Sequence, residues 1–329
     1  MPKKSAYAVV IPEVGSADVL TTQPVAVEEP GWREVRIRQT AVGVNFIDIY
    51  HRKGLYALPK YPHAIGMEAA GVVDAVGEGV SGFAVGDRVV YAAGPPGAYA
   101  THRIMPMDRV VWLPDAVSDQ VAAAAFLKGM TVEALIHRVA PVKPGMTVLW
   151  HAAAGAVGSI AVQWLRHLGV DVIGTVGSRE KADVAAANGC KYIIDTSRED
   201  ISDKVRALTR GEGVPISFDS VGAATFEESL SSLSRRGMFV AFGNASGKPD
   251  PFDPMEFARR GSLFFTRPTL WDYIAKREEL EQSSAALFDV LSRGIVRCEP
   301  ARSFPLRDAG DAHRALESRK TTGATILIP

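Results

Sequence analysis

Cysteine is scarce in this chain: of its 329 residues only Cys190 and Cys298 are cysteines. They lie far apart and match no spacing of zinc ligands, and none of the seven histidines forms an H-x-x-x-H or comparable pair. We therefore expect no metal site. One disulfide between two cysteines is not excluded, but a reducing cytoplasm with free thiols fits this usage better.

The formal net charge is zero, because 37 Lys and Arg residues balance 37 Asp and Glu residues. Such a balance argues against a nucleic-acid-binding protein, which typically carries a basic excess. No apolar run approaches the ~18 residues of a membrane-spanning helix. The first residues lack the apolar stretch of a signal peptide. We expect a cytoplasmic protein with no membrane partner and no nucleic-acid partner.

The first part of the chain reads as a β-rich domain. Short apolar runs predict strands at 7–11, 35–44, 70–76 and 88–91, and glycine-containing turns separate them. This spacing favours a barrel-like arrangement over β-α-β units. We expect one domain over residues 1–125, since a chain of 329 residues exceeds a typical single core.

The pattern changes near residue 121. A helix is expected over 121–139, and from there strands alternate with helices, as in an α/β domain with a doubly wound parallel sheet. The expected strands are 147–151, 171–175, 192–195, 216–219, 238–242 and 263–266. We assign a dinucleotide-binding domain to 126–270. Residues 271–329 contain expected helices at 273–293 and 308–318 and a closing strand at 324–328, which needs the first domain's sheet as a partner.

A small-residue turn provides the sharpest local signal. The strand at 147–151 leads into Ala153-x-Gly155-x-x-Gly158, a G-x-G-x-x-G motif with alanine in first place, and an amphipathic helix follows. Gly155 lets the backbone approach a pyrophosphate, Gly158 lets the helix pack on the strand, and the helix N-terminus attracts phosphate. The alternative is a tight turn without a ligand, which this context makes the weaker interpretation.

The second expected strand indicates which dinucleotide binds. NAD-binding domains place an acidic residue at its end, about 20 residues after the glycine turn. Here that position, Thr175-Val176, is neutral, and Ser178, Arg179 and Lys181 follow. A hydroxyl and two cations suit a 2′-phosphate, so NADPH is favoured over NADH, although Glu180 lies among them and an ordinary charged first helical turn would look the same.

Several motifs now make the chain resemble the NADPH-dependent quinone oxidoreductases (zeta-crystallin-like) of the medium-chain dehydrogenase/reductase superfamily. The resemblance runs along essentially the whole chain. It rests on GVNFIDIY at 43–50, GMEAAGVV at 66–73, GDRV at 86–89, FLKGMT at 126–131, HAAAGAVG at 151–158, FDSVG at 218–222, FGNASG at 242–247, TRP at 266–268 and ESR at 317–319.

The resemblance implies a Rossmann domain plus a GroES-like catalytic domain, with NADPH in the cleft between them, and a homodimer joined through the Rossmann sheets. It implies cofactor contacts at matching positions, to which the charge argument adds Arg179. These are Asn45, Phe46, Tyr50, Lys128, Thr131, Gly155, Ala156, Val157, Gly177, Ser178, Arg179, Lys181, Phe242, Gly243, Asn244 and Arg319. The family often has a tyrosine where this chain has Thr196, which puts the 2′-phosphate pocket in doubt unless Arg179 compensates.

Zinc alcohol dehydrogenases of the same superfamily carry a cysteine at the position of Asn45 and a histidine at that of Met67. Without zinc there is no Lewis acid to polarise a ketone, so the site suits acceptors that need little activation, such as quinones. The predicted function is zinc-independent NADPH:quinone reduction. Alternatives are reduction of α,β-unsaturated carbonyls, and a cofactor-binding protein with a crystallin-like or RNA-binding role.

No catalytic residue is identified, but four side chains are candidates for the substrate pocket: Asn45, Tyr50, Tyr56 and Lys128. Tyr56 is the obvious proton donor for an enone, and Lys128 is placed to meet the cofactor or a phenolate. The alternatives are a turn-forming Asn45, core-packing tyrosines and a surface lysine. Glu68 is expected to be structural, and His51 and Arg52 are expected to face solvent.

Overall fold

The computed structural model describes residues 6–329, and in it the chain forms two compact units. The first unit runs up to Leu127 and also contains Lys276–Ser292 and Cys298–Pro329. The second consists of Lys128–Ala275 and Arg293–Arg297. The last of these segments joins the second unit because the Gln163 side chain bonds both the N–H and the carbonyl of Arg297, at 2.9 and 3.1 Å.

The second unit is built on a six-stranded sheet in which every neighbouring pair is parallel. The strand order is β11-β10-β9-β12-β13-β14, so the direction of winding reverses between β9 and β12. Ligands of doubly wound sheets bind at such a reversal, beyond the carboxyl ends of the strands. The strands are β9 (Thr147–Trp150), β10 (Asp171–Val176), β11 (Tyr192–Asp195), β12 (Val214–Asp219), β13 (Leu233–Ala241) and β14 (Phe264–Thr266).

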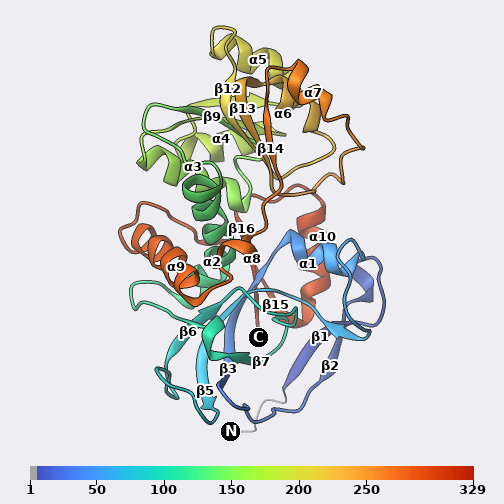
Figure 1. Cartoon of the computed structure of the whole chain (residues 1–329). Coiled ribbons are helices and arrows are strands. Elements are labelled where there is room, and N and C mark those ends of the chain that lie inside the picture. Colours follow the sequence, from blue (N-terminus) through green and yellow to red (C-terminus); the bar gives the residue numbers. More distant parts are fainter. Residues whose placement is uncertain (1–5) are drawn as a thin grey trace. The chain divides into compact units, whose positions relative to one another are not determined.

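Helices pack on this sheet and bury its apolar side chains (Figure 1). Leu149 and Ile173 share one core cluster with Val205 of α5 and Leu230 of α6, whereas α3 and α4 pack against β10. The helices are α3 (Ala156–His167), α4 (Arg179–Ala187), α5 (Ile201–Leu208), α6 (Phe226–Ser231), α7 (Met255–Arg259) and α8 (Leu270–Tyr273). This is the doubly wound α/β domain that the alternating pattern predicts.

The first unit contains two sheets within the described residues. The larger follows the order β15-β16-β3-β5-β6-β8, with β7 also paired to β3, and the smaller is β2-β1-β4. Their strands are β1 (Tyr7–Ile11), β2 (Thr21–Pro24), β3 (Glu34–Val44), β4 (His63–Ala64), β5 (Ala69–Val76), β6 (Arg88–Tyr91), β7 (His102–Pro106), β8 (Val111–Trp112), β15 (Pro300–Pro305) and β16 (Ala324–Ile328).

Three helices of the first unit position residues discussed below: α1 (Phe46–Arg52), α9 (Arg277–Ser292) and α10 (Ala309–Glu317). A fourth helix, α2 (Asp119–Glu133), continues as a π-helical turn over Ala134–Val139 and contains the boundary between Leu127 and Lys128. The closing strand β16 pairs with β3, Ile326 opposite Gly43, so the end of the chain lies in the larger sheet of the first unit.

The structure differs from the expected elements in two ways. The helix expected over 273–293 begins only at Arg277, because Tyr273 ends α8 and the Glu279 carboxylate accepts the Lys276 N–H at 3.0 Å, which starts a new helix. The sequence also did not predict β2 or β15. Both are mostly exposed strands, so they lack the alternation of buried and exposed residues on which strand prediction depends.

Candidate active site

The turn after β9 has the geometry of a dinucleotide-binding turn. Gly155 is the N-cap of α3, and Gly158 lies in the first turn of that helix. A Cβ on Gly158 would lie only 2.3 Å from the carbonyl oxygen of Ala152, so a larger residue would push the helix off the strand. The first N–H groups of α3, those of Ala156 and Val157 among them, have no acceptor within the helix and suit a phosphate.

A buried histidine that sequence reasoning did not single out holds this turn. Thr175 Oγ accepts the Ala152 N–H at 3.2 Å and lies 3.2 Å from His151 Nδ1. His151 Nε2 lies 2.9 Å from Ser229 Oγ, which donates to Asp219 Oδ2 at 2.8 Å. Burial lowers the pKa of His151, so the ring is neutral, with Nδ1 accepting from Thr175 and Nε2 donating to Ser229.

Asp219, the last residue of β12, completes the network. Its Oδ1 accepts the N–H groups of Val221 and Gly222, at 2.7 and 3.1 Å. These contacts tie the ends of β9, β10 and β12 together. Ser229, His151 and Asp219 do not form a hydrolytic triad, because Asp219 contacts Ser229 rather than His151 and all three side chains are buried. Their role is to position the turn.

The residues expected at the 2′-phosphate follow β10. Ser178 is the N-cap of α4, and its Oγ accepts the Lys181 N–H at 3.4 Å. Arg179 is exposed and Lys181 is half-buried. Thr196 is exposed, its Oγ donates to the Val176 carbonyl at 3.1 Å, and it is the nearest side chain to Gly177. The structure therefore places the departure from the family pattern directly beside this loop.

A further loop begins where β13 ends. Phe242 lies 5.6 Å from Trp150 between ring centroids, and its N–H donates to the Asp219 carbonyl at 2.7 Å. A Cβ on Gly243 would lie 2.4 Å from the Ser220 carbonyl oxygen, so only glycine fits there. Asn244 is half-buried. The expected cofactor residues on the loops after β9, β10 and β13 thus all lie at the carboxyl edge of one sheet.

In the first unit, Asn45 is buried and precedes α1. Its Nδ2 donates to Glu68 Oε1 at 2.8 Å, and Glu68 Oε2 accepts the Leu127 N–H at 2.7 Å. Its backbone N–H donates to Asp48 Oδ2 at 2.9 Å. The structural role expected for Glu68 is confirmed: its carboxylate is fully buried and joins the start of α1 to α2.

Aromatic side chains line α1 and the loop after it. Phe46 and Tyr50 have ring centroids 6.3 Å apart, and Tyr56 meets Tyr50 edge-on at 5.4 Å. All three are half-buried. The structure therefore brings together three of the expected residues on one short segment, next to Asn45.

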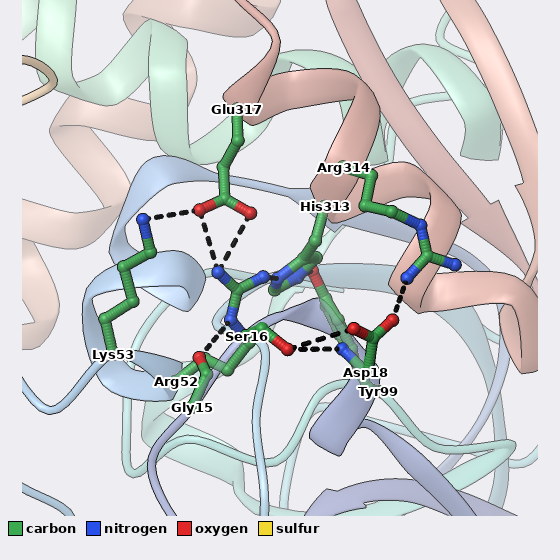
Figure 2. Close-up of polar contacts among 9 residues, drawn as sticks. All are labelled: Gly15, Ser16, Asp18, Arg52, Lys53, Tyr99, His313, Arg314 and Glu317. Carbon is green, nitrogen blue, oxygen red and sulfur yellow. Dashed lines mark hydrogen bonds and ion pairs between the residues drawn. The ribbon is translucent and has the colours of Figure 1, made fainter.

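His51 and Arg52, which were expected to face solvent, are both buried, and that expectation is wrong. Acceptors inside the first unit replace the water around Arg52: its Nε donates to the Gly15 carbonyl at 3.1 Å, and its Nη2 donates to both oxygens of Glu317, at 2.8 and 2.9 Å (Figure 2). Burial lowers the pKa of His51 to about 4, with a further lowering by His63. Because α1 is short and flanked by polar loops, no hydrophobic periodicity in the sequence indicated that His51 and Arg52 are buried.

The remaining expected residues lie on α2 and after α10. Lys128 is buried, contrary to the alternative of a surface lysine, and Thr131 is half-buried one turn further along α2. Arg319 is exposed and follows the C-terminus of α10 with a φ of 56°, a conformation that favours glycine.

These features define a class of protein: an oxidoreductase with a Rossmann domain and a GroES-like domain. Two family models match the chain, "Alcohol dehydrogenase GroES-like domain" over residues 31–115 and "Zinc-binding dehydrogenase" over residues 156–284. The fold class expected from the sequence is confirmed.

The chain belongs to the quinone oxidoreductase family of the medium-chain dehydrogenases/reductases. It is 45% identical to a quinone oxidoreductase of Salmonella typhimurium over 317 residues, covering 96% of this chain and 97% of the relative. It is 44% identical to a 2-haloacrylate reductase of Burkholderia sp. over 328 residues, covering 98% of each. A crystal structure of an Escherichia coli quinone oxidoreductase complexed with NADPH matches with a TM-score of 0.97 at 42% identity, covering 98% of this chain and 100% of that one.

The residues present do not fit a catalytic zinc ion, despite the name of one family model. Asn45 carries an amide that is already bonded to Glu68, and Met67 carries a buried thioether, so neither supplies the thiolate or imidazole that a catalytic zinc ion takes. Over residues 6–329 no group of three or more His, Cys, Asp or Glu side chains is arranged to hold a metal ion. In the same residues no helix has both the length and the apolar character needed to span a membrane.

Proposed function

We propose that this protein is a zinc-independent NADPH:quinone oxidoreductase. The observation that carries the proposal is 43–45% identity, over nearly the whole chain, to several proteins named quinone oxidoreductase. The close packing at Gly158 supports a dinucleotide-binding turn, and neither Asn45 nor Met67 is a thiolate or imidazole ligand of the kind that a catalytic zinc takes. Residues up to about 125 and the returning tail would form the catalytic domain, and 126–270 the dinucleotide-binding domain.

NADPH would be bound in the second unit by the edge at which β9, β10 and β13 end. The N-terminus of α3 would receive the pyrophosphate, and Ser178, Arg179 and Lys181 the 2′-phosphate. Thr175, and not a carboxylate, stands near the end of β10. Its hydroxyl contacts His151 and the Ala152 N–H in the turn after β9. When bound, NADPH supplies a hydride; the protein supplies position and charge.

The electron acceptor would meet residues of the first unit. The rings of Phe46, Tyr50 and Tyr56 offer apolar surface to a flat quinone, and the Tyr56 hydroxyl offers a hydrogen-bond donor. Asn45 is held by Glu68 and Asp48, so its amide is fixed in orientation before any ligand binds. A hydroquinone anion is aromatic, so it needs neither a metal nor a strong acid to form, and solvent can protonate it.

A second candidate function is reduction of an activated C=C bond in a small unsaturated acid or carbonyl compound. The observation that favours it is 44% identity to a 2-haloacrylate reductase over nearly both whole chains. Hydride addition to such an acceptor leaves a carbanion or enolate that must be protonated. Tyr56, packed edge-on against Tyr50, would be the proton donor in that reaction.

We also propose that the protein is a homodimer joined through β14. This strand is the edge of the Rossmann sheet, and it exposes Phe264 by 56% and Phe265 by 37%. Met255 on the nearby α7 is 55% exposed. An apolar edge strand normally pairs with a second strand or aggregates, and a second copy of β14 would continue the sheet.

Steady-state turnover with NADPH and NADH against 1,4-benzoquinone, 2-chloroacrylate and a simple enone tests the two proposed reactions together. The main proposal predicts NADPH-dependent reduction of the quinone at a kcat/KM well above those of the other two acceptors. A preference for 2-chloroacrylate would support the second function and reject the first. Absence of NADPH oxidation with all three would reject both.

A further inference from the structure

A buried arginine in the first unit has no place among the proposed ligand contacts. Arg52 is the last residue of α1, and its side chain has no exposed surface. Its guanidinium donates to Gly15, His313 and Glu317, three groups from widely separated parts of the chain. Taking a charge out of water is costly, and an apolar pair of similar size would stabilise the fold equally well. The network therefore calls for an explanation other than stability.

The hydrogen bonds of this network have one consistent direction. Arginine only donates, so Arg52 Nη1 must donate to His313 Nδ1, 3.1 Å away. The proton of the neutral imidazole then lies on Nε2, which donates to Tyr99 Oη at 2.9 Å. Tyr99 in turn donates to Asp48 Oδ2 at 3.1 Å. Each group has a single role because the arginine at one end and the carboxylate at the other leave no choice (Figure 2 shows the arginine end).

The chain of bonds ends at the candidate site. Asp48 Oδ2 also accepts the backbone N–H of Asn45, the residue before the first turn of α1. At the other end, Glu317 is the last residue of α10, two residues before Arg319. One continuous set of hydrogen bonds thus connects the start of α1 with the end of α10, and each of these ends adjoins a proposed ligand contact.

We propose that Arg52 is a positioning residue that, through His313, Tyr99 and Asp48, fixes Asn45 relative to Arg319. The inference rests on the proposed function for its catalytic consequence, since Asn45 and Arg319 matter only if NADPH binds. The structural part of the inference does not depend on the proposed function. Loss of the Tyr99 hydroxyl would release Asp48 from the network, and the start of α1 would then be held to its surroundings mainly by the bond between Asn45 and Glu68.

Tyr99→Phe is the sharpest variant, because it removes one hydroxyl group and cuts the chain between His313 and Asp48. Tyr91→Phe is the matched control. Tyr91 is equally buried in the same unit and donates its hydroxyl to Gln39, which is not part of the network. Glu317→Gln, which weakens the other end of the chain, is the second test variant, and both tests use the full-length protein.

The first measurement is amide hydrogen exchange at residues 45–48, which requires no ligand. We expect Tyr99→Phe to raise exchange there roughly 10-fold over wild type, and Tyr91→Phe to leave it unchanged. Equal exchange in the two variants would overturn the proposal, whatever the protein's activity. A protein inactive with NADPH would refute the proposed function but leave this result valid.

The second measurement is kcat at saturating NADPH and quinone, compared with the KM for each. Misplacement of a positioned group lowers kcat, whereas a purely structural loss lowers the melting temperature and leaves kcat unchanged well below it. We expect kcat of Tyr99→Phe and Glu317→Gln to fall roughly 10-fold, with that of Tyr91→Phe close to wild type. Normal kcat in Tyr99→Phe would refute the catalytic part of the proposal.

Discussion

Asn45 and Glu68 are joined by a hydrogen bond of 2.8 Å inside the first unit, and the other oxygen of the same carboxylate accepts the Leu127 N–H at 2.7 Å. A carboxylate is the one side chain that accepts on both atoms at once. The pair therefore fixes an amide at the start of α1 to the backbone of α2.

Glu68→Gln is predicted to destabilise the protein by about 2 kcal/mol, because one N–H donor would then face the amide NH2 group of glutamine without an acceptor. Urea unfolding measures this loss. Glu34→Gln is the matched control. Glu34 accepts only the exposed Gly31 N–H at 2.9 Å, so its replacement should cost less than about 0.5 kcal/mol. Equal losses in the two variants would contradict the role assigned to Glu68.

Arg179→Gln and Lys181→Gln are predicted to weaken NADPH binding selectively. Loss of one charge-assisted contact to a phosphate should raise the Kd for NADPH roughly 10-fold and leave that for NADH unchanged. Calorimetric titration with each nucleotide measures the ratio. Lys191→Gln is the control, since Lys191 pairs with Asp171 at the opposite end of β10. An unchanged NADPH/NADH ratio in both test variants would place the 2′-phosphate elsewhere.

His313 should make the protein less stable in acid. Burial, followed by the charge of Arg52, lowers its pKa from 6.5 to about 3. Below pH 6.5 the unfolded chain binds a proton that the folded protein refuses until about pH 3, so this contribution to stability is lost across that window. From about pH 7.5 to about pH 5.5 the free energy of unfolding should fall by about 1.4 kcal/mol on this account.

His313→Gln should remove that part of the pH dependence even if it lowers stability at every pH. Urea unfolding at the two pH values compares the slopes rather than the levels. His167→Gln, a change at an exposed histidine, should leave the pH dependence as in wild type. Because His51 and His151 also have lowered pKa values, part of the slope should remain, and only a slope equal to that of wild type would show that His313 is not a buried neutral group.

Phe264→Lys is predicted to convert a homodimer to monomers, because a buried interface would acquire a charge without a partner. Light scattering coupled to gel filtration measures the mass. Val85→Lys is the control, since Val85 is similarly exposed, at 64%, but belongs to the first unit and not to β14. A wild-type monomer, or a dimer that tolerates Phe264→Lys, would contradict the proposed interface.

The alternation of strand-like and helix-like segments along the chain predicted most of the second unit. Strands such as 192–195 and the glycine turn follow from apolar runs and close packing, both of which are local and visible in sequence. The bounds expected for the closing strand, 324–328, are those observed for β16. Its pairing with a sheet was expected because an isolated apolar strand needs a partner strand. Exposed strands such as β2 were missed, since nothing in their composition marks them.

Buried polar groups were the main failure. Arg52 was expected to face solvent, as charged side chains usually do. Its acceptors, Gly15 and Glu317, lie 37 and 265 residues away, so no local pattern reveals them. The same holds for His151, whose partner Ser229 is 78 residues distant. Both become visible only when the fold brings separate segments together.

The most direct test of the account is NADPH oxidation by the purified protein with 1,4-benzoquinone, before and after dialysis against a metal chelator. The account predicts that turnover with NADPH greatly exceeds that with NADH and is unchanged by the chelator. Turnover that disappears on dialysis and returns with added zinc, or no turnover with NADPH at all, would contradict it.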